Sequence, residues 1–138
     1  MFAVRAATLA DRPEIIAMIR EMIPGIDADA RWRWLYDSNP GGRALTWIAH
    51  DGDAVAGCTS FFPFRLWLDG EEVRAALGGD GYVRPAWRRR GLGGLMHDAS
   101  RRDMPCSKHN ETSSARCHPG SHLRLSCIRT ETSETVNL

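Results

Sequence analysis

Residues 81–96 have the sequence GYVRPAWRRRGLGGLM, and they are the most informative part of the chain about its fold. Its beginning is typical of the end of a strand, and Pro85 cannot donate a ladder hydrogen bond, so regular pairing should stop there. A helix is predicted over residues 91–103, because four apolar side chains repeat on one face: Leu92, Leu95, Met96 and Ala99. The pattern therefore predicts a strand that passes through a glycine-rich turn directly into a helix.

Such a junction is a good place for an anion. Backbone N–H groups without intrahelical acceptors converge there with the positive end of the helix dipole, and both favour phosphate. Gly91 and Gly93 lack a Cβ, so a bulky diphosphate can approach the main chain closely. Arg88, Arg89 and Arg90 add positive charge. We therefore predict a phosphate site at residues 88–94, in which the glycines matter more than the arginines.

The residues before this junction predict a strand followed by two helices. The strand covers residues 2–7, and a helix follows Asp11, which with Pro13 and Glu14 supplies an N-cap, an early proline and a first-turn carboxylate. Pro24 should end this helix. A second short helix is expected over residues 29–37. One broad face of the first helix is apolar, with Ile15, Ile16, Met18, Ile19, Met22 and Ile23.

Three further stretches are predicted as strands, over residues 45–50, 54–67 and 73–83. The pairs Asp51-Gly52 and Asp69-Gly70 between them suit tight hairpin turns. The expected order is thus strand, helix, helix, three strands, helix. This order predicts an α+β fold with helices packed on a mostly antiparallel sheet.

Composition excludes several classes of protein. Eighteen Lys and Arg against seventeen Asp and Glu leave a net charge of +1, so no whole-protein field favours nucleic acid or an anionic membrane. No stretch approaches the roughly 18 apolar residues of a membrane span. Asp11, Arg12 and Glu14 interrupt any run of signal-peptide length, which predicts a cytoplasmic protein. No metal site is expected, and the oligomeric state is left open.

The junction resembles motif A of the GNAT superfamily of N-acetyltransferases, Gln/Arg-x-x-Gly-x-Gly/Ala after a strand that ends in Val-x-Pro. Both the motif and its spacing from Val83 and Pro85 match. The resemblance covers residues 1–104 and implies a GNAT-like mixed, mostly antiparallel sheet flanked by helices, incomplete at its C-terminal end. It also implies that main-chain amides hold the pyrophosphate of acetyl-CoA, at Arg88, Arg89, Arg90, Gly91, Leu92, Gly93 and Gly94.

The resemblance further implies that the backbone of Gly81, Tyr82 and Val83 pairs with the pantetheine arm, and that an acetyl group passes from acetyl-CoA to a primary amine. The acceptor would be a small molecule or a peptide. Asp80 is the candidate general base, directly or through water, or else a loop or strand-end residue that bonds its own backbone. Tyr82 is the candidate proton donor to the departing thiolate, unless strand alternation turns its ring into the core.

The composition changes abruptly after Met104. All eleven aromatic residues precede position 88, whereas residues 105–138 hold ten Ser and Thr residues. We therefore expect a partial acetyl-CoA-binding domain over residues 1–104 and an atypical, irregular tail over residues 105–138. A shifted reading frame or a truncated gene end is our hypothesis for the origin of the tail.

The tail bears on whether the chain is active and whether it folds. The superfamily pattern continues after motif A with another strand, a helix and a Tyr that protonates coenzyme A, and nothing after position 87 matches it, so weak or no turnover is expected. The chain would then be an inactive acyl-CoA-binding or partner-binding module, or a fragment with an exposed sheet edge that does not fold stably. Zinc binding is disfavoured, because the candidates fit no standard finger: Cys106, His109, Cys117, His118 and His122.

Overall fold

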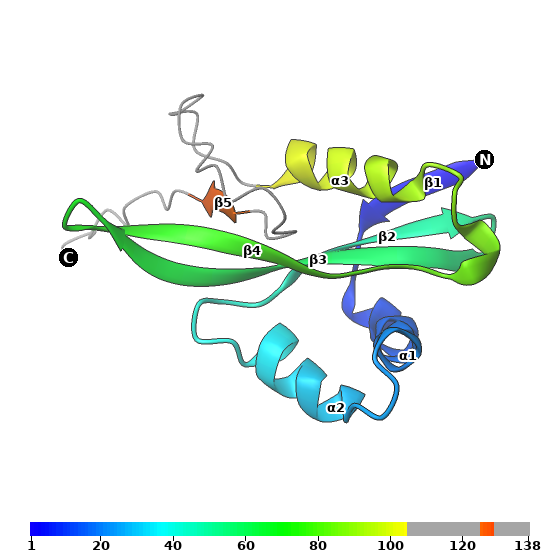
Figure 1. Cartoon of the computed structure of the whole chain (residues 1–138), viewed down its shortest axis with the longest axis horizontal. Helices are drawn as coiled ribbons and strands as arrows, with labels where there is room; N and C mark the ends of the chain where they lie inside the picture. The colour runs from blue at the N-terminus through cyan, green and yellow to red at the C-terminus, as the bar shows by residue number, and fades with distance from the viewer. Residues whose placement is uncertain (105–124, 129–138) are drawn as a thin grey trace, which may run out of the picture.

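The structure, a computed structural model, describes residues 1–104 and 125–128 (Figure 1). Its strands and helices occur in the predicted order, followed by one further strand. The elements are β1 (Phe2–Ala6), η1 (Leu9–Asp11), α1 (Arg12–Met22), α2 (Ala28–Arg31), η2 (Trp32–Asp37), β2 (Leu45–Asp51), β3 (Ala54–Leu68), β4 (Glu71–Val83), η3 (Pro85–Trp87), α3 (Leu92–Asp103) and β5 (Leu125–Ile128).

The described strands form one sheet in the order β1-β2-β3-β4-β5, and each neighbouring pair is antiparallel. The two Asp-Gly turns join β2 to β3 and β3 to β4 as hairpins. The β3–β4 hairpin is long, with 15 and 13 residues in its strands, and its tip projects beyond the rest of the sheet (Figure 1). The prediction of an α+β fold with a mostly antiparallel sheet is confirmed.

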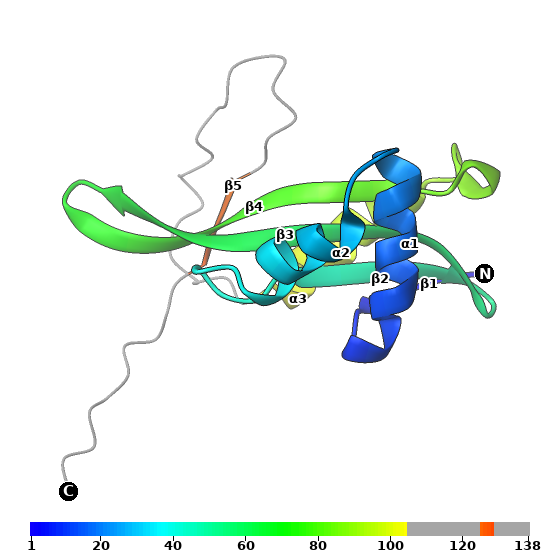
Figure 2. The same cartoon turned by 90° about the horizontal axis from the view of Figure 1, so that it is seen from below.

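Helices cover both faces of this sheet. In Figures 1 and 2, α1 and α2 lie on one face and α3 lies on the other. The alternation of side chains along β2 explains how one strand serves both layers. Ile48 packs into the cluster under α1, whereas its neighbours Trp47 and Ala49 pack in the clusters under α3.

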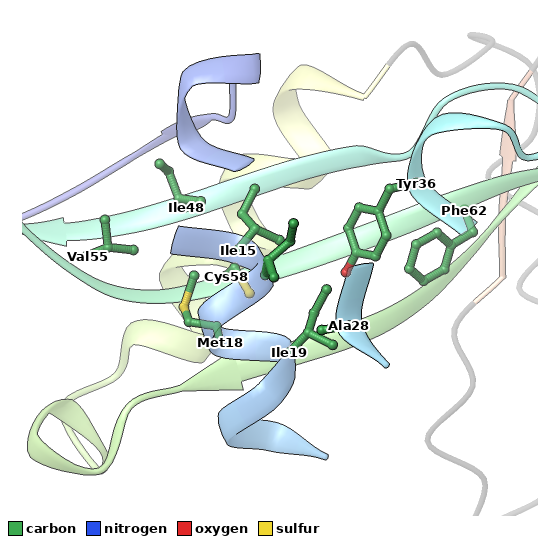
Figure 3. Packing of buried hydrophobic residues seen from close by; sticks show 10 residues of the cluster. Ile15, Met18, Ile19, Ala28, Tyr36, Ile48, Val55, Cys58 and Phe62 are labelled. Carbon is green, nitrogen blue, oxygen red and sulfur yellow. The ribbon is translucent and has the colours of Figure 1, made fainter. Parts of the chain in front are cut away.

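The core under α1 and α2 is the larger of the two (Figure 3). Ile15, Met18 and Ile19 of α1 are at most 1% exposed, and each stabilises the fold by about 1.5–3 kcal/mol through burial. The prediction for Ile23 was wrong. This residue is 36% exposed, because α1 ends at Met22 and Ile23 follows as the C-cap.

The second predicted helix, over residues 29–37, is divided in two. The side chain of Asp27 caps α2 by accepting a hydrogen bond from the Ala30 amide at 2.9 Å, and the chain then continues as the π-helix η2. Trp32 and Tyr36 stack within this segment, with ring centroids 4.8 Å apart. Tyr36 is 3% exposed and belongs to the core.

The third helix, α3, packs on the opposite face through a stripe that includes Leu92, Met96 and Ala99. Leu95 was predicted on the same face and is instead 46% exposed. The buried stripe continues from Ala99 through Ser100, which leaves Leu95 at the margin of the helix. The packing fixes the start of α3 beside the end of β4, where the phosphate site was predicted.

Strand β5 comes from the segment expected to be an irregular tail. It pairs with β4 only at residues 74–77, and the expectation of irregular structure does not hold for residues 125–128. All five candidate zinc ligands of the tail lie outside the described residues. Within residues 1–104 and 125–128, no helix is both long enough and apolar enough to cross a membrane.

Candidate functional site

The turn between β4 and α3 is shaped by a proline and two left-handed residues. Pro85 begins the short helix η3, and Gly91 caps the start of α3 with φ of +81°. Glycine adopts this conformation without a steric penalty, whereas Arg89, with φ of +61°, incurs a cost of about 1 kcal/mol. The turn therefore has a defined shape that exposes the first amides of α3.

A pocket of about 390 Å³ opens where this turn meets the end of β4. It is lined by Gly81, Tyr82, Val83, Trp87, Arg88, Arg89, Gly91, Leu92 and Gly93. All the residues predicted to bind the cofactor are in this set except Arg90 and Gly94. The pocket thus combines the end of a strand, a glycine-rich turn and the N-terminus of a twelve-residue helix.

The glycines leave open space in front of the turn. A Cβ added to Gly91, Gly93 or Gly94 would meet no other atom within 4 Å. By contrast, a Cβ on Gly57 of β3 would approach the Tyr82 carbonyl oxygen to 2.6 Å, so that glycine serves close packing between strands. The room at the turn is what a bulky anion needs to reach main-chain amides.

The three arginines of the turn have different surroundings. Arg89 lines the pocket and is exposed. Arg88 lies over the ring of Tyr82 at 5.5 Å, and its Nε donates to the Val83 carbonyl oxygen at 2.9 Å. Arg90 instead lies over the ring of Phe2 at 4.7 Å, with its Nη1 3.8 Å from the Asp51 carboxylate. Arg90 is thus directed towards β1 and the β2–β3 turn.

Trp87 is a pocket residue that the sequence did not single out. Its indole Nε1 donates to the Asp51 carboxylate at 3.0 Å, which ties the turn after β4 to the end of β2. The sequence placed Trp87 inside the motif but gave Asp51 only a role in a hairpin turn. Together with the Arg90 contact, this hydrogen bond makes Asp51 the anchor of the turn over residues 85–94, at which the phosphate site is predicted and which is called the phosphate-site turn below.

Tyr82 lies between the pocket and the core, and its role as a proton donor stays a prediction. It lines the pocket, and it also packs against the core cluster beneath α1. Beside it, the outer edge of β4 has no strand partner over residues 78–83 within the described part of the chain, because β5 reaches only to Leu77. An extended ligand can therefore pair with this edge next to the pocket.

The register of β3 and β4 breaks at Asp80. Cys58 faces Tyr82, but Ser60 faces Gly79, so that Asp80 and Gly81 together oppose the single residue Thr59. This is a β-bulge, which redirects the strand. Asp80 has φ of +50°, a left-handed conformation that costs a non-glycine residue about 1 kcal/mol.

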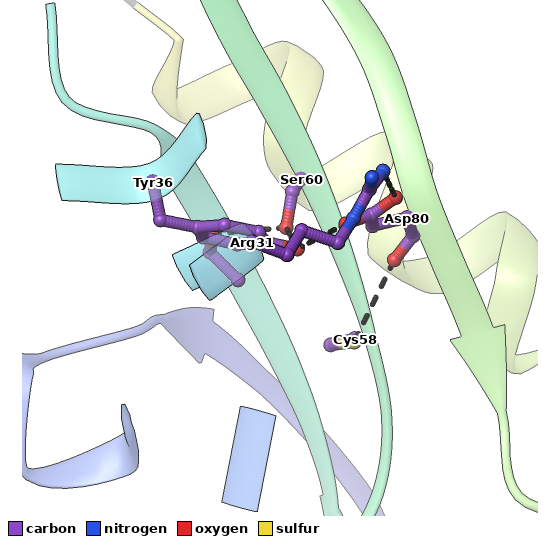
Figure 4. Close-up of polar contacts among 6 residues, drawn as sticks. Arg31, Tyr36, Cys58, Ser60 and Asp80 are labelled. Atoms are coloured by element: carbon purple, nitrogen blue, oxygen red, sulfur yellow. Dashed lines mark hydrogen bonds and ion pairs between the residues drawn. The ribbon is translucent and has the colours of Figure 1, made fainter. Parts of the chain in front are cut away.

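The carboxylate of Asp80 is buried and fully engaged (Figure 4). Its side chain is 5% exposed. Arg31 donates from Nε to Oδ2 at 2.9 Å and from Nη2 to Oδ1 at 2.6 Å, and the Tyr36 hydroxyl donates to Oδ2 at 2.8 Å. These side-chain partners, and not the local backbone, hold Asp80. Its carboxylate does not line the pocket.

Hydrogen bonds extend this cluster through the sheet. Ser60 donates to the Tyr36 hydroxyl oxygen at 3.3 Å, and the Ser60 and Thr46 hydroxyls lie 3.0 Å apart. On the other side, the Cys58 thiol donates to the backbone carbonyl of Asp80 at 3.7 Å. Burial, and then the Asp80 charge, raises the pKa of Cys58 to about 12 and also raises the pKa of Tyr36, so both groups stay protonated.

The sequence reasoning missed Arg31 and Tyr36 as partners of this site. They lie 49 and 44 positions before Asp80, and no local pattern links them to it. Burial of Tyr36 was the expected behaviour of an aromatic residue at helical spacing. Only the sheet register and the bulge bring these groups together.

Comparison with known proteins identifies the family of the chain. The chain matches the model of the acetyltransferase (GNAT) domain over residues 3–111. No curated protein matches the sequence. Among solved structures, the chain is similar to glucosamine-6-phosphate N-acetyltransferase from Arabidopsis thaliana, with 14% identity, a TM-score of 0.49, and coverage of 74% of this chain and 76% of that chain.

A likeness as distant as this one says nothing about the substrate of the present chain. The family match, by contrast, spans most of the sequence, including the whole turn from Pro85 to Gly94 and the helix that follows. The chain therefore belongs to the GNAT acetyltransferase family.

Proposed function

We propose that the chain is an N-acetyltransferase that transfers an acetyl group from acetyl-CoA to a primary amine of a small molecule or peptide. Family membership supports the class of reaction. The observation that carries the finer proposal is the pocket at the start of α3, because it lies between a turn suited to an anion and a β4 edge that has no strand partner among the described residues. An acyl-CoA has a diphosphate and an extended amide-bearing arm, and it can use both. A cytoplasmic location stays a prediction from the sequence.

The anion end of the pocket suits the pyrophosphate of acetyl-CoA. The first amides of α3 lack intrahelical acceptors, and the helix dipole makes this end positive. Open space at Gly91 and Gly93 supports direct contact between these amides and phosphate oxygens. Arg88 and Arg89 supply charge at the pocket. Leu92 and Gly94 contribute main-chain amides in the same helical turn, whereas Arg90 contributes indirectly by holding the turn to Asp51.

The strand end of the pocket suits the pantetheine arm. The backbone of Gly81, Tyr82 and Val83 lies at the outer edge of β4, where amide groups of an extended ligand can pair with it. The Arg88 Nε donates to the Val83 carbonyl oxygen at 2.9 Å, so a ligand that pairs with this oxygen must use its second lone pair or displace Arg88. The thioester is proposed to lie beside Val83.

Acetyl transfer forms a bond from the amine nitrogen to the acetyl carbon and breaks the bond from that carbon to sulfur. The amine loses a proton, and the departing thiolate gains one. We propose Tyr82 as the donor to the thiolate, because it lines the pocket. Asp80 was the candidate base, but Arg31 and Tyr36 use both of its oxygens, and we propose that it acts by position instead.

A specific observation favours the second candidate function, an inactive acyl-CoA-binding module. Among the described residues, those that line the pocket include no Asp, Glu or His that could accept a proton from the amine. An amine that arrives already neutral needs no such base, so the two functions differ in turnover and not in binding.

The experiment combines calorimetric titration with coenzyme A and acetyl-CoA with an assay of free thiol release over a panel of primary amines. Binding with amine-dependent thiol release is the result expected for the transferase. Binding without release supports the inactive module, and no binding at millimolar concentrations of either ligand contradicts both. A Tyr82→Phe variant should retain coenzyme A binding and lose about 100-fold or more in thiol release if Tyr82 is the donor.

A further inference from the structure

We propose that Arg31 and Tyr36 are positioning residues for the acyl donor, because they clamp Asp80 and thereby fix the β-bulge that directs the Gly81–Val83 backbone into the pocket. This inference rests on the proposed function, since it concerns the same site. It assigns to α2 and η2 a part in shaping a strand that lies more than forty positions away in the sequence.

The bulge at Asp80 needs an external restraint. Asp80 has φ of +50°, which L side chains rarely adopt, and it stands where two β4 residues oppose Thr59 alone. Such a conformation persists only where the surrounding contacts determine it. Gly81 follows directly and lines the pocket, so whatever holds Asp80 sets the course of the chain at the pocket.

The clamp formed by Arg31 and Tyr36 supplies this restraint. The Arg31 guanidinium makes two charge-assisted hydrogen bonds, of 2.9 and 2.6 Å, to the two oxygens of one carboxylate, which fixes its orientation as well as its position. Tyr36 adds a third bond, of 2.8 Å. Figure 4 shows these groups converging on Asp80 from the helical segment across β3.

Packing around Tyr36 holds the clamp in place. Tyr36 is 3% exposed, it stacks on Trp32, and its ring meets Phe62 edge to face at 5.1 Å. Its hydroxyl also accepts from Ser60. The π-helical segment from Trp32 to Asp37 places this side chain, and the bulge is therefore coupled to a rigid layer of the core.

The Asp80 carboxylate acts by positioning the strand and not by direct contact with the ligand. The Asp80 side chain is buried away from the pocket lining, and its carboxylate is hydrogen-bonded to Arg31 and Tyr36. Its influence on a bound thioester must pass through the backbone of the next three residues. Removing the clamp should therefore disturb the strand end while leaving the phosphate-site turn, which Asp51 anchors separately, in place.

The test follows backbone amide resonances by NMR as coenzyme A is added. In the wild type, coenzyme A should shift the amides of Gly91 and Gly93 at the turn and that of Gly81 at the strand edge. In Arg31→Lys and Asp80→Asn, the Gly91 and Gly93 amides should respond as before, whereas the Gly81 amide should be displaced in the free protein and lose its response. Arg43→Lys is the matched control, because Arg43 makes an exposed pair with Asp37 of η2 at 2.7 Å.

A second variant guards against simple unfolding. Asp80→Gly permits the positive φ without strain and removes the clamp. It should fold, bind coenzyme A through the turn within about threefold of wild type, and lose about 10- to 100-fold in kcat for thiol release, since a misplacement near 1 Å has that effect. A wild-type Gly81 response in Asp80→Gly, with undiminished kcat, would overturn the clamp.

The NMR titration distinguishes failure of the proposed acyl-CoA binding from failure of the positioning role of Arg31 and Tyr36. If coenzyme A shifts none of the three glycine amides in the wild type, the proposed function is wrong and the clamp proposal falls with it. If it shifts all three in the wild type and in every clamp variant alike, acyl-CoA binding stands and only the positioning role of Arg31 and Tyr36 is overturned.

Discussion

Two polar regions flank the Gly81–Val83 backbone, and they are built in opposite ways. The phosphate-site turn is exposed, is formed by consecutive residues, and is held by the partly exposed Asp51, whose side chain is 31% exposed. The Asp80 clamp is buried and joins residues 49 positions apart. Changes in the turn should therefore weaken ligand binding at little cost to stability, whereas changes in the clamp should reduce stability first.

The largest effect is expected from breaking the clamp outright. Arg31→Met leaves the Asp80 carboxylate, 5% exposed, without its cation, and should lower the free energy of unfolding by about 3 kcal/mol. Chemical denaturation measures this loss. The matched control is Arg43→Met, which breaks an exposed ion pair and should lower stability by less than about 1 kcal/mol. Equal losses in the two variants would mean that burial does not distinguish the clamp from a surface pair.

An intermediate effect on the free energy of unfolding is expected when the pH is raised into the alkaline range. The pKa of Cys58 is raised from 9.0 to about 12 in the folded protein, so the unfolded chain releases this proton first. Between these two pKa values, the free energy of unfolding should fall with rising pH by up to about 1.4 kcal/mol per unit for this one group.

Chemical denaturation at a series of pH values from 8 to 11 measures this dependence, which concerns the buried region around Asp80. Cys58→Ala should flatten the decrease in the free energy of unfolding between pH 9 and 11. Any loss of stability that the substitution causes at neutral pH is a separate, pH-independent effect. Tyr36, whose pKa burial also raises, accounts for a slope that remains at the upper end. An unchanged slope in Cys58→Ala would show that the Cys58 thiol is not the group responsible.

The smallest effect is expected from loosening the turn. Asp51→Asn keeps the size of the side chain and weakens its bond with the Trp87 indole and its attraction for Arg90. Coenzyme A affinity should fall by about threefold, and stability by less than about 1 kcal/mol, as befits a partly exposed anchor. Calorimetric titration and thermal unfolding measure the two effects. A larger loss of stability than in Arg31→Met would reverse the contrast between the regions.

The same contrast explains what the sequence could predict. Pro85, Gly91 and the apolar repeat of α3 are local signals, so the turn and its strand and helix were predicted with ends within about two residues of those in the structure. Arg90 was assigned to the ligand because it lies within the resembled motif, whereas the position of its side chain is set by Phe2 and Asp51. That the turn residues bind acetyl-CoA stays a prediction.

The clamp could not be predicted from the sequence. Asp80 looks like a strand-end carboxylate, and Arg31 looks like a basic residue at the end of a short helix. Their pairing depends on the hairpin register, on the bulge opposite Thr59, and on the change from α-helix to π-helix at Trp32. Each of these is a tertiary feature that arises only when the sheet and the helices pack together.

The central claim is that the glycine-rich turn binds the diphosphate of an acyl-CoA through bare main-chain amides. Its most direct test is calorimetric titration of coenzyme A against three proteins: wild type, Gly91→Glu and Gly70→Glu. Gly91 and Gly70 have nearly the same φ, +81° and +84°, and neither has an atom within 4 Å of an added Cβ, so the two substitutions incur the same backbone strain. Gly70 lies at the tip of the β3–β4 hairpin, far from the pocket (Figure 1).

We predict that wild type and Gly70→Glu bind coenzyme A with equal affinity, and that Gly91→Glu binds it at least about tenfold more weakly, because a carboxylate then occupies the anion site. Equal affinity in all three proteins, or no binding by the wild type at millimolar coenzyme A, would contradict the account.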